Sequence, residues 1–178
     1  RRRICRVSAT GLLGNGLSDA ENYEDALSVQ EAELAMDRRL GASEHNILIS
    51  QGNLAISYKD LGRLEKALST ERDVYSGRLR LHGEEHESTI RAALNYAASL
   101  GQLQRFEEAK ALLRKTIPVA RRVLGENHEA TLTLRWNWAI ALLVDPTATL
   151  DDLREAVSTL EDTERTARRV LGSAHPIT

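Results

Sequence analysis

The chain has 178 residues, of which 42% are hydrophobic and 28% are charged. This composition is typical of a folded soluble protein and is too apolar for a disordered chain. The net charge of −2 and the isoelectric point near 6.3 argue against a nucleic-acid-binding chain. The longest apolar run, residues 138–144, is far too short to span a membrane.

Aromatic residues make up only 4% of the sequence, and Leu and Ala supply most of its apolar content. This balance favours close-packed helices over sheets. The single cysteine, Cys5, cannot form an internal disulfide, which is consistent with a reducing compartment. Since no signal peptide is recognisable, we expect a cytoplasmic protein. The chain does not begin with methionine, so we also expect it to be a fragment of a longer array.

An internal repeat organises the whole chain. Four histidines follow one another at spacings of 41, 42 and 47 residues, and an alanine precedes each by 19 residues. The histidines are His45, His86, His128 and His175, and the alanines are Ala26, Ala67, Ala109 and Ala156. The string Ala-Arg-Arg-Val-Leu-Gly occurs at 120–125 and again at 167–172. Four repeats are therefore predicted, spanning about 6–45, 46–86, 87–128 and 129–175.

Each repeat predicts a pair of helices and no strand. In chain order, the eight predicted helices are 6–18, 22–40, 46–61, 64–81, 88–102, 105–124, 130–144 and 150–171. In the first helix, a gapless alignment places Leu13 and Gly14 opposite Leu54 and Ala55, whereas matching Asn15 to Asn53 needs a three-residue gap. We prefer the gapless register. The fold class is thus all-α, an α-solenoid that forms a single domain over residues 1–178.

Particular residues predict where the helices begin, end and bend. The second helix of each repeat begins at a bulky residue followed by a charged pair and alanine, and it ends at a glycine suited to a left-handed cap. Pro118 lies inside the helix 105–124 and should bend it, because its ring clashes with the carbonyl of Arg114. Pro146 should end the preceding helix, and Thr149 with Asp152 forms a predicted capping box.

These residues resemble the 42-residue tetratricopeptide repeat of kinesin light chains and related adaptors. In that family, the repeat reads roughly Asn-Asn-Leu-Ala, then Gly-x-Tyr-Glu-Glu-Ala, then Leu-Gly-x-x-His-Pro. The second asparagine is kept here as Asn53, Asn95 and Asn137, and the alanine helix start and Leu-Gly-x-x-His turn are kept in most repeats. The first asparagine is replaced by Gly52, Leu94 and Trp136, and the proline survives only as Pro176.

The resemblance implies a groove lined by the first helix of each repeat, in which an extended peptide binds. Asn53, Asn95 and Asn137 would bond the peptide backbone, because an amide offers both a donor and an acceptor. The alternative is that they only bond neighbouring helices. Trp136 is expected to face this groove, partly exposed, while Trp138 packs between helices.

Two cations extend the candidate site. Arg91 lies one helical turn before Asn95, and Lys59 follows Asn53 by six residues. Either cation could pair with a carboxylate of the peptide, so acidic residues are expected in the partner. The alternative for each cation is simple solvation.

No catalytic or cofactor chemistry is indicated. The four repeating histidines belong to different repeats and should not converge on one zinc ion, so we expect a turn role and no metal. No nucleophile elbow or phosphate loop is present, and the acidic pairs stand at loops or helix starts. We therefore expect neither an enzyme nor a cofactor.

Two classes of function remain open. The first is an adaptor or scaffold module that binds a protein or peptide partner, with no nucleic acid or membrane. The second is a structural spacer or self-associating repeat whose uncapped ends bind one another, or a set of sensor repeats on a signalling ATPase, with an empty groove.

Overall fold

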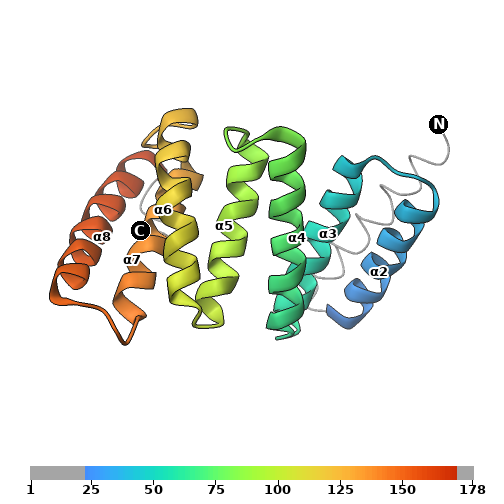
Figure 1. The fold of residues 1–178 in the computed structure, drawn as a ribbon, viewed down its shortest axis with the longest axis horizontal. Helices are drawn as coiled ribbons and strands as arrows, with labels where there is room; N and C mark the ends of the chain where they lie inside the picture. Colours follow the sequence, from blue (N-terminus) through green and yellow to red (C-terminus); the bar gives the residue numbers. More distant parts are fainter. Residues whose placement is uncertain (1–22, 172–178) are drawn as a thin grey trace. The chain divides into compact units, whose positions relative to one another are not determined.

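The computed structural model describes residues 23–171, and this part of the chain is helical with no strand (Figure 1). Its seven helices are α2 (Tyr23–Arg39), α3 (Glu44–Asp60), α4 (Leu64–His82), α5 (Glu87–Gln102), α6 (Phe106–Val123), α7 (Glu129–Val144) and α8 (Leu150–Leu171). Each lies within two residues of its predicted bounds. The helix predicted at 6–18 lies outside the described residues. The all-α solenoid fold is confirmed.

The chain divides into two compact parts, Arg1–Leu81 and His82–Thr178. The N-terminal part holds α2, α3 and nearly all of α4, and the C-terminal part holds α5 to α8. The predicted repeats would pair α3 with α4 in the second, α5 with α6 in the third, and α7 with α8 in the fourth. A single continuous array over residues 1–178 stays a prediction.

The interior of the N-terminal part is unusually polar. The Ser57 hydroxyl donates to Oε1 of Gln30 at 2.7 Å, and the Ser50 hydroxyl donates to Oδ2 of Asp37 at 2.7 Å. All four side chains are buried. Beside them lies a small apolar cluster of Leu27, Leu34 and Leu54. Because buried polar groups cost stability unless they are hydrogen-bonded, these two bonds specify the register of α2 against α3.

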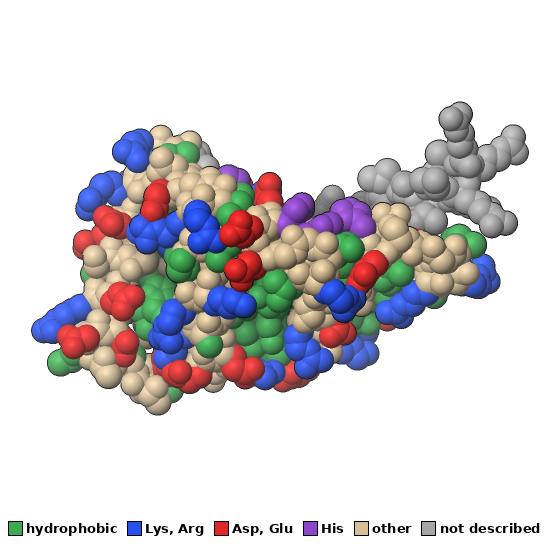
Figure 2. Space-filling model, turned by 45° about the horizontal axis from the view of Figure 1, so that its top comes forward, with side chains coloured by type: hydrophobic (Ala, Val, Ile, Leu, Met, Phe, Trp, Pro, Cys, Tyr) green, Lys and Arg blue, Asp and Glu red, His purple; other side chains and the backbone are tan. Residues whose placement is uncertain are grey.

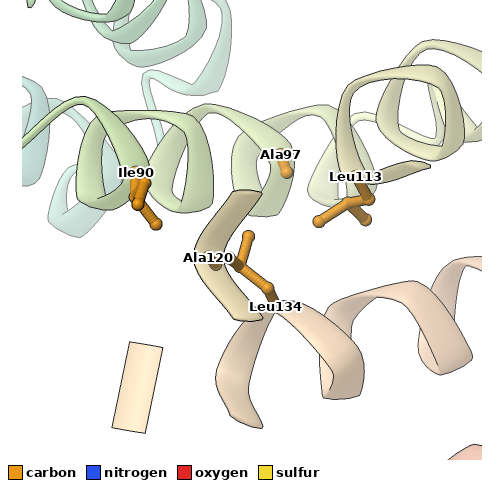
Figure 3. Packing of buried hydrophobic residues seen from close by; sticks show 5 residues of the cluster. All are labelled: Ile90, Ala97, Leu113, Ala120 and Leu134. Atoms are coloured by element: carbon orange, nitrogen blue, oxygen red, sulfur yellow. The ribbon is translucent and has the colours of Figure 1, made fainter. Parts of the chain in front are cut away.

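The C-terminal part has a larger apolar cluster in its interior. A buried cluster joins three helices: α5 contributes Ile90 and Ala97, α6 contributes Leu113 and Ala120, and α7 contributes Leu134 (Figure 3). The two alanines leave room for the larger side chains of the facing helices. Burial of this cluster holds α5, α6 and α7 together, and so positions the surface that α5 and α7 share.

The turns confirm the predicted glycine caps. Gly41, Gly83 and Gly125, each predicted to end a second helix, all have a positive φ. At Gly125, for example, φ is 95°. This left-handed region is open to glycine at little cost and disfavours residues with a Cβ.

Of the repeating histidines among residues 23–171, His86 and His128 cap the helices that follow them and His45 does not. Nδ1 of His86 accepts from the backbone N–H of Ser88 at 3.1 Å, and Nδ1 of His128 accepts from that of Ala130 at 3.2 Å. In the second repeat, Ser43 caps α3 instead, so α3 begins at Glu44. His45 then lies in the first turn, where its Nδ1 accepts from the guanidinium of Arg78 at 3.0 Å.

The predictions for Pro146 and Pro118 have different outcomes. The capping box before α8 is confirmed, because the Asp152 N–H donates to Thr149 Oγ1 at 3.2 Å and the Thr149 N–H donates to Asp152 Oδ2 at 2.8 Å. Helix α7 ends at Val144, two residues before Pro146, as predicted. Helix α6 continues through Pro118 to Val123, so this proline does not end the helix. The predicted bend at Pro118 stays a prediction.

Candidate functional site

The candidate site lies on α5 and α7, the first helices of the third and fourth repeats. These two helices contact each other, and both pack on α6. Asn95 on α5 and Asn137 on α7 hold equivalent positions 42 residues apart. The Asn95 side chain is exposed, while Asn137 is half-buried at the wall of a groove. The C-terminal part thus brings one of the predicted asparagines to a hollow in the surface.

This groove has a volume of about 500 Å³. Its lining comes from α5, α7, the start of α6 and the turn between α5 and α6: Ala97, Ala98, Gly101, Gln102, Gln104, Phe106, Ala109, Asn137, Ile140, Ala141 and Val144. None of these residues is charged. The polar side chains among them are the amides of Gln102, Gln104 and Asn137, which can donate and accept hydrogen bonds. We call this hollow the amide-lined groove.

Arg91 lies one turn before Asn95 on the exposed side of α5. Its Nε donates to Oε1 of Glu87 at 2.9 Å, and this hydrogen bond lowers the pKa of Glu87. Both side chains are about half exposed, so the pair is weak and can exchange partners. Acidic and basic side chains are interspersed over the face shown in Figure 2.

The predicted residues of the N-terminal part are placed differently. Asn53 is half-buried on α3. The Lys59 ammonium donates to Oε1 of Glu71 on α4 at 2.7 Å, and the Glu71 side chain is only 4% exposed. A buried carboxylate needs a counter-ion, so this ion pair has a structural role between α3 and α4. A partner contact at Lys59 stays a prediction.

A smaller groove of about 380 Å³ in the N-terminal part has a different character. It is lined partly by charged residues, Glu31, Arg38 and Asp73. The Tyr58 hydroxyl donates to Oε1 of Glu31 at 3.2 Å, and burial, together with this bond, raises the pKa of Tyr58. Its charges distinguish this hollow from the amide-lined groove.

Neither metal ligation nor membrane insertion is indicated by the described residues. Within residues 23–171, no group of three or more His, Cys, Asp or Glu side chains could hold a metal ion. Among the same residues, no helix is both long enough and apolar enough to cross a bilayer.

Comparison with known families identifies the repeat. The family model described as tetratricopeptide repeat matches residues 6–80 and 88–143, which together make up most of the chain. The chain belongs to the tetratricopeptide repeat family. The second matched segment, 88–143, spans α5, α6 and α7 to within one residue.

Three solved structures share the fold. A Podosopora anserina protein with nearly identical TPR-like repeats of kinesin light chain type is 22% identical, with a TM-score of 0.78 over 97% of this chain and 80% of that chain. A variant of the same protein has a TM-score of 0.80 at 22% identity, over 97% and 79% of the two chains. BtubC (BKLC) from P. vanneervenii is 17% identical, with a TM-score of 0.66 over 98% and 88%. No curated protein matches the chain.

The two tryptophans of the fourth tetratricopeptide repeat have different surroundings. Trp138 packs between helices, as predicted: its Nε1 donates to Oε1 of Glu155 on α8 at 2.9 Å, and the Arg114 guanidinium of α6 lies 5.5 Å from its ring centroid. Trp136 is half-buried against Ala167 of α8 and does not line the amide-lined groove. Its partial exposure agrees with the prediction, but its orientation toward the peptide groove and its role in binding stay predictions.

Most residues of the amide-lined groove escaped the sequence-based prediction, which followed only the family's asparagines. A signal was present in the 42-residue spacing. Three residues after the asparagine, the third repeat has Ala98, whereas the second and fourth repeats have Ile56 and Ile140. Six residues after it, the third repeat has Gly101, whereas the second and fourth have Lys59 and Leu143. Small residues in the third tetratricopeptide repeat therefore stand where its neighbours have large ones, and a hollow at this place could have been anticipated.

Proposed function

We propose that this chain is a protein-interaction module that binds an extended peptide along the exposed face of α5 and α7. The observation that supports this most directly is the equivalent placement of Asn95 and Asn137, one on the surface and one at the wall of the amide-lined groove. Two amides 42 residues apart can bond successive stretches of one peptide backbone. The role would be that of a non-enzymatic adaptor or scaffold in the cytoplasm.

Arg91 gives the proposed site a basic end. Because its present partner is an exposed glutamate, exchanging Glu87 for a peptide carboxylate would cost little. We therefore propose that an acidic side chain of the partner binds Arg91, beside the backbone contact at Asn95.

The remaining predicted residues have unequal support. Asn53 would extend the row of backbone contacts in the second repeat, and Trp136 would offer part of its ring to an apolar side chain. Lys59 has the weakest support, because its ammonium already neutralises buried Glu71. A partner that took Lys59 would leave that carboxylate without its counter-ion.

Replacing both asparagines tests the proposal. Peptides selected from a phage-displayed random library on the unchanged protein provide the probe, and fluorescence anisotropy measures their affinity. We expect the double substitution Asn95→Ala and Asn137→Ala to weaken binding about tenfold, since each hydrogen bond contributes roughly 0.5–1.5 kcal/mol.

Asn127→Ala is the matched control, because Asn127 is an exposed asparagine in the turn before α7. It should leave the affinity unchanged. A selected peptide that binds the double variant as tightly as the unchanged protein would contradict the proposed site.

Self-association is a second candidate function. Leu150 and Val157 on α8 are 72% and 49% exposed, and with Leu153 they form an apolar stripe on one face of the helix. We call these three residues the α8 stripe. A second copy of the chain is the occupant proposed for it, because this face of α8 corresponds to the face of α6 that packs on α7 through Lys110 and Arg114.

A further inference from the structure

The amide-lined groove differs from its counterpart in the preceding repeat at two linked positions. Forty-two residues earlier, Lys59 stands at the position of Gly101 and Gly62 at that of Gln104. The third repeat therefore has glycine where the second has a long side chain, and a long side chain where the second has glycine. Both changed positions line the groove.

Gly101 supplies the space. A Cβ built at Gly101 would meet no heavy atom within 4 Å, so the groove is open directly beside this glycine. Apolar side chains of Ala97, Ile140 and Val144 surround this opening. An apolar group of about the size of a leucine or valine side chain fits such a hollow, whereas a carboxylate would lose its hydration with no cation among the lining residues to compensate.

Gln104 supplies an amide at the edge of this space, at a cost in backbone strain. Its φ is 58°, and among the described residues it is the only non-glycine with a positive φ. The left-handed region disfavours a residue with a Cβ, and the equivalent Gly62 has a φ of 67° without that cost. Strained residues of this kind cluster at binding sites, where the contribution of the side chain to binding outweighs the cost of the strain to folding stability.

We propose that the amide-lined groove selects an extended partner segment by one apolar side chain placed over Gly101. Gln102, Gln104 and Asn137 bond the main-chain amides on either side of that residue. The segment is uncharged at this position, and any acidic residue lies toward Arg91 instead. This inference rests on the proposed peptide-binding function and adds to it the chemistry of the central residue.

Blocking the groove tests the inference on the same phage-selected peptides. We expect those peptides to share an apolar residue, whose replacement by Glu weakens binding about tenfold to a hundredfold. Gly101→Leu fills the hollow with a side chain and should weaken binding by a similar factor. Gly52→Leu is the matched control: Gly52 is also a helix glycine whose Cβ would meet nothing within 4 Å, but it does not line the groove.

Gln104→Gly separates binding from stability. It relieves the left-handed strain, so the midpoint of thermal unfolding should rise, while loss of the amide should weaken peptide binding severalfold. These opposite changes cannot come from misfolding. A variant that is both more stable and equally tight in binding would remove Gln104 from the site.

The outcomes distinguish the two proposals. If selection enriches no peptide, both the peptide-binding function and this inference fail. If the asparagine double variant weakens binding but Gly101→Leu does not, the function stands and the groove inference fails. Enriched peptides that share an acidic residue at the position sensitive to Gly101→Leu would also overturn the inference.

Discussion

At the scale of single residues, the C-terminal part has a charged pair at two positions where the N-terminal part has an apolar pair. Leu27 of α2 and Leu61 after α3 belong to the same apolar cluster. The residues at the same two positions in the C-terminal part are Lys110 and Asp145, which form a 2.6 Å ion pair with side chains 13% and 5% exposed. Thr147 also donates to Asp145 through its N–H and its hydroxyl.

This ion pair should make stability depend on pH at both extremes. The hydrogen bond from Lys110, with those from Thr147, holds the pKa of Asp145 well below its usual range, and the bond to Asp145 raises the pKa of Lys110. The carboxylate's contribution is complete above its unfolded pKa and is lost as the pH falls through its folded pKa. The ammonium's contribution is complete below its unfolded pKa and is lost as the pH rises through its folded pKa.

Restoring the leucine pair tests this account. Asp145→Leu alone places an apolar side chain against the Lys110 ammonium and leaves it only the exposed carboxylate of Glu107 as a partner, so the thermal midpoint should fall by several degrees. Adding Lys110→Leu recreates the apolar pair and should recover most of the loss, and it should flatten the acid limb of a stability–pH profile measured by circular dichroism. Thr147→Ala serves as the control for the hydroxyl bond. A double variant no more stable than Asp145→Leu would disprove the equivalence of the two pairs.

At the scale of helices, a single glycine determines how closely α4 packs on α3. A Cβ built at Gly77 of α4 would lie 2.5 Å from Cδ2 of Leu48 on α3. Leu48 is buried, so its side chain has little room to move. Glycine in a helix normally costs about 0.5–1 kcal/mol relative to alanine, and at this position the close approach of Leu48 offsets that cost.

Alanine substitution at two helix glycines should therefore have opposite effects. Gly77→Ala should lower the free energy of unfolding by about 1–3 kcal/mol, because the new methyl group overpacks against Leu48. Gly52→Ala on α3 should raise it by about 0.5–1 kcal/mol, since a Cβ there would meet no atom within 4 Å. Urea denaturation of both variants measures the difference. Equal shifts of one sign would show that helix propensity alone governs these positions.

The helices were predictable because several markers with one period agree. Alanine, glycine and histidine positions recur in phase, and each has a local physical role: close packing, a left-handed cap or an N-cap. The start of α3 was misplaced by two residues because Ser43, not His45, caps that helix. Nothing in the spacing distinguishes His45, whose different role depends on Arg78, a residue 33 positions away that folding brings beside it.

The candidate site was less predictable because it depends on volume and on pairings across helices. The family's asparagines pointed to α5 and α7, but the amide-lined groove exists because Gly101 lacks a side chain and Gln104 adopts a left-handed backbone. A sequence does not show where space remains after packing. Likewise, the sequence does not show that the Lys59 ammonium is paired with Glu71 of α4, because this ion pair forms only when the two helices pack.

At the scale of the whole molecule, contacts between repeats explain why the α8 stripe is a candidate interface. In α6, Lys110 contacts Asp145 at the end of α7, and Arg114 lies over the Trp138 ring of α7. Val157 and Glu161 hold the same two positions in α8, 47 residues later. The face of α8 that bears them therefore corresponds to the face of α6 that packs on a first helix of the next repeat. Such a face can take the first helix of a following repeat or, in a head-to-tail contact, a first helix of a second copy.

A charge placed in the α8 stripe should abolish this contact without unfolding the chain. Val157→Glu puts a carboxylate at a half-exposed position, so the folded monomer tolerates it, whereas burial against a second copy would leave that carboxylate unpaired. Sedimentation velocity over a range of protein concentrations should show association of the unchanged chain and a monomer for Val157→Glu. Val170→Glu is the matched control, since Val170 is a 45% exposed valine on the same helix but outside the stripe, and it should associate like the unchanged chain. If the unchanged chain remains monomeric at every concentration, or if both variants associate equally, the stripe does not bind a second copy.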